Sequence, residues 1–233
     1  KLKKEEIKTK HIHETANFII SLSNINGIGI KSAKGAHSHL DGHIREIDER
    51  VNRCIEAIPQ YPEHPEYSLL VSEQLRPAWE TRRNKIKKKS NTALFSKINR
   101  YLSPSDFGFH NILVDMDKLN FIDFEYGGKD DLAKLVADFA LNPQTQISTK
   151  YSDLFKNSII SNIKLDKGFS ERVELLKYIG KIKWACITLN DFVSTSKNRR
   201  KHAGINLNRR HLEQQIGLAS RFLEKSIGED SIS

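Results

Sequence analysis

Apolar residues recur at steps of three and four along most of the chain, a spacing typical of helices with one buried face. The clearest stripe covers 40–58, and three prolines follow it: Pro59, Pro62 and Pro65. Because proline lacks a backbone N–H, these residues are expected to end that helix. Pro77 predicts a kink or a late start in the next one. The predicted helices cover the first 24 residues and about 40–58, 69–87, 131–141, 150–160, 170–192 and 208–226.

The middle of the chain, from Tyr101 to Tyr126, has little helical pattern. Two short apolar runs, 112–114 and 120–124, flank a polar, turn-like stretch at 115–118, and this order predicts a β-hairpin. The whole pattern predicts an α+β fold that is mostly α, with the hairpin between irregular loops. Catalytic side chains concentrate on such loops when rigid elements hold them.

Composition narrows the class of protein. The 233 residues carry a net charge of +9 and are 38% hydrophobic, which excludes a fully disordered chain. No apolar run is long enough to span a membrane, and two cysteines are too few for a disulfide scaffold. We therefore expect a cytoplasmic protein of one large or two small domains. The chain begins with Lys1 and its single methionine is Met116, so we expect a trimmed or processed chain, or part of a longer one.

The candidate chemistry lies in the same middle segment, where 102–113 reads L-S-P-S-D-F-G-F-H-N-I-L. Asp106 is followed five residues later by Asn111, and Asp123 comes after the predicted hairpin. Phosphoryl transfer needs a carboxylate to accept the proton of the attacking hydroxyl and oxygen ligands to hold Mg²⁺. A hairpin returns the chain to its starting point, so Asn111 and Asp123 are expected to meet.

This pattern, D-x-x-x-x-N, hairpin, I-D-F-E, resembles the aminoglycoside phosphotransferase and choline kinase group, which has the protein-kinase-like fold. The resemblance is strongest to bacterial small-molecule phosphotransferases with an S-P-S-D-F-G-x-H-N segment. It is sharp over about 102–139 and weaker elsewhere. Further similar segments are 130–134, 136–139, 184–187 and 189–192.

The resemblance implies a role for each residue of the motif. Asp106 would be the catalytic base, and Asn111 and Asp123 the Mg²⁺ ligands. A set of three would be cofactor-binding, with ATP as the co-substrate: Ser105, His110 and Glu125.

Two departures from the family pattern stand out. Pro104 replaces the family's usual His, so the serines beside it, Ser103 or Ser105, are expected to hold the loop. No strand-rich N-terminal lobe is recognisable, so we expect 1–233 to be the C-terminal, acceptor-binding lobe, inactive alone.

The acceptor is expected to be a small hydroxylated molecule: a sugar, sugar phosphate, amino alcohol or aminoglycoside. A polycationic aminoglycoside would favour an acidic pocket, and a chain of net charge +9 shows no excess of acidic residues that would indicate one. The alternatives are a non-catalytic pseudokinase and a basic module that binds nucleic acid or another anionic polymer. The basic module would use two clusters: Lys85, Lys87, Lys88 and Lys89, and Arg199, Arg200, Lys201, Arg209 and Arg210. Neither cluster contains interleaved aromatic residues, so we do not favour nucleic acid.

Two motifs are false leads. Asp106-Phe107-Gly108 spells the metal-binding motif of protein kinases, but no catalytic loop precedes it, whereas Asn111 follows at the offset of a catalytic loop. The glycine-containing segment 27–32 lacks the flanking strand of a phosphate-binding loop.

Overall fold

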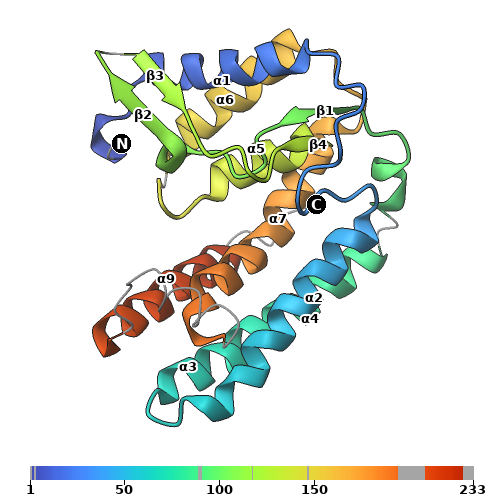
Figure 1. Ribbon diagram of the computed structural model, residues 1–233. Coiled ribbons are helices and arrows are strands. Elements are labelled where there is room, and N and C mark those ends of the chain that lie inside the picture. Colours follow the sequence, from blue (N-terminus) through green and yellow to red (C-terminus); the bar gives the residue numbers. More distant parts are fainter. Residues whose placement is uncertain are drawn as a thin grey trace. The chain divides into compact units, whose positions relative to one another are not determined.

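The computed structural model describes residues 2, 4–88, 91–116, 118–145, 147–193 and 208–227 (Figure 1). Four residues of the basic clusters lie outside this part of the chain: Lys89, Arg199, Arg200 and Lys201. The chain forms two compact units. Unit 1 comprises Lys1–Leu40 and Thr92–Lys177, and unit 2 comprises Asp41–Asn91 and Tyr178–Ser233. None of the described helices combines the length and apolarity needed to cross a membrane.

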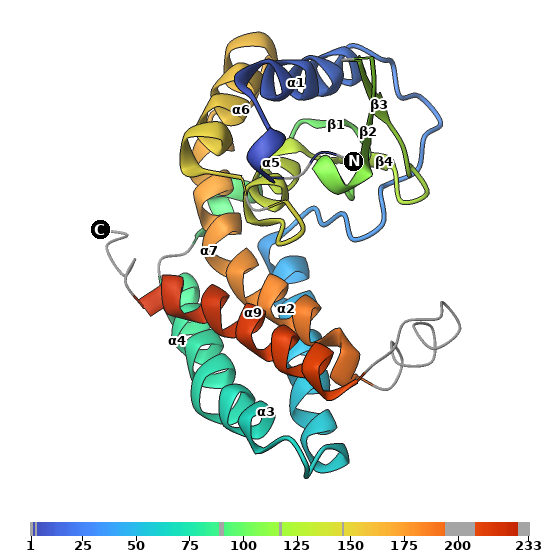
Figure 2. The ribbon, with the colours of Figure 1, turned by 90° about the vertical axis from the view of Figure 1, so that its left-hand side faces the viewer.

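Unit 1 is built around helices that the apolar spacing predicted. Its helical elements are η1 (Lys4–Glu6), α1 (Thr9–Ser23), η4 (Asn91–Phe95), η5 (Phe109–Asn111), α5 (Leu132–Leu141), α6 (Thr149–Asn162) and the first half of α7 (Phe169–Thr188). Helices α1 and α6 pack side by side, as Figures 1 and 2 both show. The apolar stripe of α1, Ile12, Ala16 and Ile19, is fully buried, so the period-3.6 pattern did mark a core-facing helix.

Two small antiparallel sheets lie within unit 1. Strands β2 (Ile112–Asp115) and β3 (Lys118–Phe121) form the predicted hairpin, with Ile112 opposite Phe121. Strands β1 (Arg100–Ser103) and β4 (Gly128–Asp131) form a second pair that the sequence did not predict. The sequence of β4, Gly-Lys-Asp-Asp, lacks the apolar alternation that would predict a strand. Its two aspartates are nevertheless buried, in polar contacts.

The segment 31–34 lies against β4. Ser32 forms a parallel bridge with Lys129, and the Ala33 N–H donates to the Lys129 carbonyl at 3.1 Å. A Cβ on Gly128 would come within 2.6 Å of the backbone of Lys31 and Ala33, so glycine is required at this close approach. The glycine-containing segment 27–32 therefore ends in a contact with strand β4.

A buried guanidinium joins three parts of unit 1. Arg172 on α7 is fully buried, and its Nε and Nη2 donate to the Asp131 carboxylate at 2.8 and 3.1 Å. The same side chain donates to Asp166 and to the Leu94 carbonyl. Asp131 also caps α5 by accepting from the Ala133 N–H at 2.9 Å. The network fixes the point where β4 passes into α5.

Unit 2 is helical. Its elements are α2 (Leu40–Ala57), η2 (Ile58–Gln60), α3 (Pro65–Leu69), η3, a π-helix (Leu70–Leu75), α4 (Arg76–Lys88), the end of α7, η6 (Leu189–Phe192) and α9 (Arg209–Ile227). The expected irregularity at Pro77 takes the form of that π-helix, whose wider turns come just before the proline. Tyr67 and Phe192 stack at 4.0 Å in the core, and the Tyr67 hydroxyl donates to the Cys54 carbonyl at 2.8 Å. Burial, followed by the neighbouring Cys54, raises the pKa of Tyr67.

Candidate active site

Asp106 lies on the loop between β1 and η5, within unit 1. Its side chain is 46% exposed, so the carboxylate can meet a substrate. The residue before it, Ser105, has φ +68°, in the left-handed region that residues other than glycine seldom adopt. The local structure therefore accepts a backbone cost at the position that presents Asp106.

Two serines hold this loop. The Ser105 N–H donates to the Ser103 hydroxyl at 3.1 Å, and the Ser105 hydroxyl donates to the Lys34 carbonyl at 3.2 Å. The segment 31–34 that packs on β4 thus also anchors the loop. Ser103 and Ser105 thus hold the loop that carries Asp106, as expected from the sequence.

Asn111 connects the loop to the far end of the hairpin. Its side chain is buried, and its Nδ2 donates to the Asp106 carbonyl at 3.1 Å. Its own carbonyl accepts from the Ile122 N–H at 3.1 Å, immediately before Asp123. The amide uses its nitrogen on the loop, and no described residue donates to its Oδ1. The structure therefore places Asn111 between the Asp106 loop and the segment that carries Asp123.

Asp123 follows β3 and has φ +66°. Of the three described non-glycine residues with positive φ, Ser105 and Asp123 belong to the predicted site, and Met116 lies in the hairpin turn. Asp123 and Glu125 are both exposed, and neither side chain has a hydrogen-bond or ionic partner among the described residues. Their oxygens are open to solvent or to a ligand.

Four phenylalanines pack around these segments. Phe18 on α1 stacks on Phe121 with ring centroids 4.0 Å apart, and on Phe107 and Phe124 at 5.9 Å. Phe107 follows Asp106, whereas Phe121 and Phe124 flank Asp123. The aromatic cluster thus supports both candidate carboxylates from one helix.

His110 contacts the candidate base directly. Its Nε2 lies 3.2 Å from Asp106 Oδ1, and its Nδ1 lies 3.1 Å from Asn142 Nδ2. Asn142 is buried at the end of α5, and no motif in the sequence pointed to it. Asn142 and His110 are 32 residues apart in the sequence, so no local motif links them. The nucleotide-binding role expected of His110 remains a prediction, as do the cofactor roles of Ser105 and Glu125.

The donor set fits Mg²⁺ in kind but is small. Asn111 offers an amide oxygen and Asp123 a carboxylate, both hard ligands suited to Mg²⁺. Among the described residues, no group of three or more His, Cys, Asp or Glu side chains could hold a metal. Two protein ligands are what Mg²⁺ needs where phosphate oxygens and water complete its shell.

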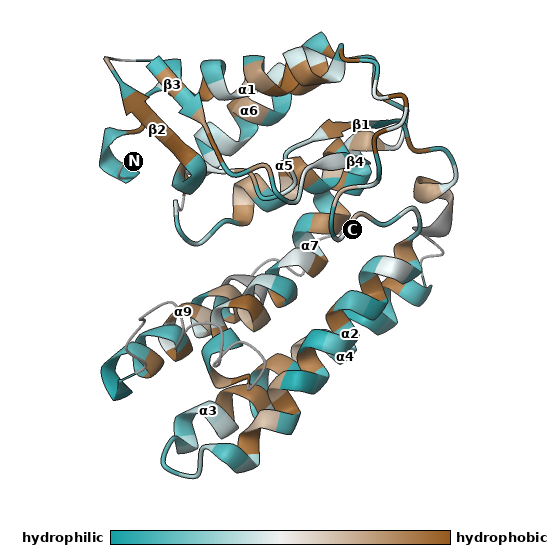
Figure 3. Ribbon diagram, viewed as in Figure 1, coloured by the Kyte–Doolittle hydropathy of each residue, from teal (hydrophilic) through white to brown (hydrophobic). Residues whose placement is uncertain are grey.

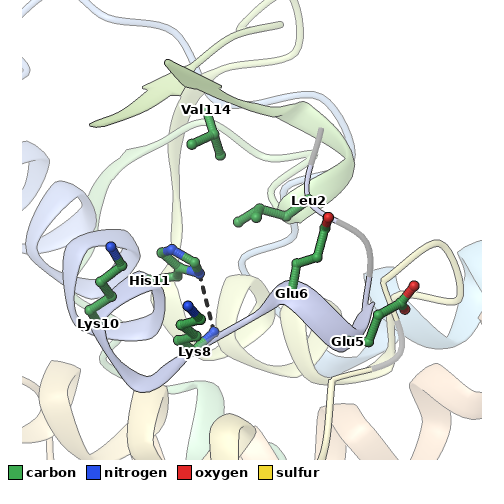
Figure 4. Close-up of a pocket in the computed structure, with 7 residues that line it drawn as sticks. All are labelled: Leu2, Glu5, Glu6, Lys8, Lys10, His11 and Val114. Atoms are coloured by element: carbon green, nitrogen blue, oxygen red, sulfur yellow. Dashed lines mark hydrogen bonds between the residues drawn. The ribbon is translucent and has the colours of Figure 1, made fainter. Parts of the chain in front are cut away.

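A pocket of about 550 Å³ opens elsewhere in unit 1 (Figure 4). It is lined by Leu2, Glu5, Glu6, Lys8, Lys10, His11 and Val114. None of the six predicted site residues contributes to it. The pocket is lined by side chains of both charges, and the His11 ring already accepts a hydrogen bond from the Lys8 N–H at 3.1 Å.

Comparison with solved structures addresses the fold. A choline/ethanolamine kinase family protein from Mesorhizobium loti matches with a TM-score of 0.59 at 11% identity, over 96% of this chain and 66% of that one. ADP-bound aminoglycoside phosphotransferase APH(2'')-Ib matches at 0.53 and 12%, over 96% and 67%. Choline kinase LicA from Streptococcus pneumoniae matches at 0.51 and 15%, over 93% and 65%.

The fold is that of the choline kinases and aminoglycoside phosphotransferases. This confirms the mostly helical α+β fold and the structural resemblance expected from the motif. The chain spans about two thirds of the length of these structures. No protein-family model matches the sequence, and neither does any curated protein sequence. The likeness found by these comparisons is thus one of structure.

Proposed function

We propose that the protein is an ATP-dependent phosphotransferase that acts on a hydroxyl of a small molecule. Asp106 is the base, and Asn111 and Asp123 hold Mg²⁺. The observation that carries the proposal is the position of Asn111, hydrogen-bonded to the Asp106 carbonyl and, through its own carbonyl, to the residue before Asp123. The left-handed backbone at Ser105 and Asp123 supports it, because such strain persists where function requires it.

In this proposal the acceptor hydroxyl gives its proton to Asp106 as its oxygen bonds to the γ-phosphorus of ATP. The bond from that phosphorus to the bridging oxygen breaks, and the products are the phosphorylated acceptor, ADP and a proton. Bound Mg²⁺ would neutralise the charge on the phosphates. The protein's part is positioning: the exposed Asp106 orients the hydroxyl, and Asn111 and Asp123 fix the phosphate end.

The apolar side chains around the site suit the aromatic ring of a nucleotide's nucleobase. Leu113 is 41% exposed, Ile122 37% and Phe124 48%, and β2 is markedly hydrophobic in Figure 3. Exposed apolar side chains beside charged groups are typical of a ligand site. We assign this surface to the nucleotide and Glu125 to the metal or acceptor side. The acceptor remains a sugar, sugar phosphate, amino alcohol or aminoglycoside, and the expected location is the cytoplasm.

We further propose that the 233 residues act as the C-terminal lobe of the enzyme. About a third of the length of the solved structures of this fold lies outside the matched part, and the described strands form only two two-stranded sheets. A nucleotide-covering lobe would supply the groups that hold the phosphates from above. The 233-residue chain alone is therefore expected to fold but to transfer little or no phosphate.

The test is a phosphotransfer assay with a panel of amino alcohols, sugars, sugar phosphates and aminoglycosides. It is run on this chain and on the chain extended by its upstream coding sequence. In the active form, Asp106→Asn should lower kcat by roughly 10²–10⁴-fold, the range for loss of a general base. Glu63→Gln, an exposed acid of unit 2, is the charge-matched control.

Each outcome bears on a different part of the proposal. Robust transfer by the 233-residue chain would contradict the half-enzyme proposal alone. Absence of transfer and of ATP hydrolysis in every form would contradict the phosphotransferase and favour a binding module. Salt-sensitive binding of RNA or DNA would then identify the basic module.

Metal binding gives a test that is independent of the acceptor. Mn²⁺ binding in the presence of ADP, followed by electron paramagnetic resonance, should be lost in Asp123→Asn. The far-ultraviolet circular dichroism should not change. Unchanged Mn²⁺ affinity in the variant would remove Asp123 from the ligand set.

A further inference from the structure

His110 occupies the position between the proposed base and a buried amide. Three hydrogen bonds run in sequence: the Gln144 N–H to Asn142 Oδ1 at 2.9 Å, Asn142 Nδ2 to His110 Nδ1 at 3.1 Å, and His110 Nε2 to Asp106 Oδ1 at 3.2 Å. All four residues belong to unit 1. The series begins at a backbone group and ends on a carboxylate oxygen.

The first bond sets the direction of the other two. Because the Gln144 N–H donates to the Asn142 oxygen, the Asn142 amide nitrogen must face His110. An amide nitrogen only donates, so His110 Nδ1 must be the acceptor. The hydrogen of the neutral imidazole is then on Nε2, which donates to Asp106. The fold therefore selects one of the two tautomers.

Burial and packing fix this arrangement. The His110 side chain is 11% exposed and Asn142 3%, whereas the Asp106 side chain is 46% exposed. A Cβ added to Gly108 would lie 2.9 Å from His110 Nδ1 and 3.1 Å from Asn142 Nδ2. Gly108, which has no side chain, thus lies where the two polar groups meet.

We propose that His110, held by Asn142, is a positioning residue for the base: its Nε2–H ties down Asp106 Oδ1 and leaves Oδ2 to receive the acceptor's proton. This inference rests on the proposed function, since it assigns His110 to the same site. An exposed aspartate on a loop can rotate about χ1 and χ2, and a fixed donor on one oxygen removes that freedom. Both ring nitrogens have protein partners, so we assign His110 to positioning Asp106, in place of the cofactor-binding role that the resemblance implies.

The first experiment does not depend on activity. Long-range proton–nitrogen correlation NMR on the 233-residue chain should show His110 with its hydrogen on Nε2 and a bare Nδ1. Asn142→Leu should remove this preference, while the exposed His13 keeps its wild-type signal as an internal control. A hydrogen on Nδ1 of His110 in the wild type would overturn the proposed series of bonds.

The second experiment uses the form of the protein that shows transfer. His110→Gln places an amide nitrogen near the position of Nε2 and should retain most of kcat. His110→Asn is too short to reach Asp106 and should lower kcat about 10–100-fold with the KM for ATP little changed, as expected for misplacement of a catalytic group. His13→Gln is the matched control.

The outcomes separate the two levels of proposal. Absence of transfer and of ATP hydrolysis in every wild-type form, the extended chain included, refutes the proposed function, and the positioning role falls with it. An active wild type whose His110→Asn variant is unimpaired refutes the positioning role alone. Equal loss in His110→Asn and His110→Gln would show that the ring matters for packing and not as a donor.

Discussion

The two units of this chain stabilise their interiors by different means. Unit 1 buries charge: Arg172 is fully buried between Asp131 and Asp166, and Lys134 is buried within 3.5 Å of Asp130. Unit 2 also buries charged side chains, Arg82 and Asp191 among them, but its core adds the stack of Phe192 on Tyr67 and both cysteines of the chain. All described non-glycine residues with positive φ also lie in unit 1.

The difference shows where the fold can be shaped for chemistry. An apolar core tolerates substitution of similar volume, whereas a buried ion network fixes the direction of each group it contains. The Arg172 network fixes the start of α5, and the end of α5 supplies Asn142, which contacts His110. The buried ion network of unit 1 is thus joined through α5 to the residue that contacts His110.

The largest expected effect comes from breaking the charge network. Arg172→Met should destabilise unit 1 by about 3–5 kcal/mol, because it leaves the buried Asp131 and the partly buried Asp166 without a cation. Phe192→Ala should destabilise unit 2 by a similar ~3–5 kcal/mol through loss of packing. Both tryptophans, Trp79 and Trp184, lie in unit 2, so their fluorescence reports that unit while circular dichroism reports both.

The two losses should differ in their dependence on pH. Burial acts to raise the pKa of Asp166, but its hydrogen bonds with Arg172 outweigh this and lower the pKa below the ordinary 3.8. A lowered carboxyl pKa stabilises the fold above the unfolded value and ceases to do so as the pH falls through the folded value. The effect of Arg172→Met should therefore shrink below about pH 4, measured by guanidinium unfolding. That of Phe192→Ala should stay constant between pH 5 and 3, and a parallel decline of both would contradict the ionic origin.

Two glycine-to-alanine substitutions test whether a side chain at position 108 would collide with His110 and Asn142. Gly108→Ala should cost about 1–3 kcal/mol, the usual range for overpacking, and should displace His110 from Asp106. Gly217→Ala on α9 meets no atom within 4 Å and should gain up to about 1 kcal/mol, because alanine favours the helix. Thermal unfolding of both variants measures the difference in sign. A stabilised Gly108→Ala variant would mean that the two polar side chains do not lie where we place them.

The sequence predicted most of what depends on apolar spacing. The stripe at 40–58 became α2, and the two apolar runs on either side of the turn-like stretch 115–118 became the β2–β3 hairpin. It also selected Asp106, Asn111 and Asp123, because their spacing along the chain is itself the signal. It did not predict β1–β4, in which the second strand ends in two buried aspartates, or Asn142, whose partner is distant in sequence. Contacts made by polar groups over long separations leave no periodic trace.

The smallest expected effect concerns the backbone at Asp123. With φ +66°, an aspartate at this position is strained, whereas glycine adopts the same conformation at no steric cost. Asp123→Gly should therefore be neutral or stabilise unit 1 by up to ~1 kcal/mol, since relief of strain offsets the greater freedom of the unfolded chain. Glu49→Gly makes the same change of charge on an exposed face of α2 and should cost about 1 kcal/mol. Hydrogen exchange within each unit gives the two values. A destabilisation at Asp123 equal to that at Glu49 would show that the left-handed backbone is not strained there; opposite signs would show that unit 1 gives up stability at the residue proposed to hold the metal.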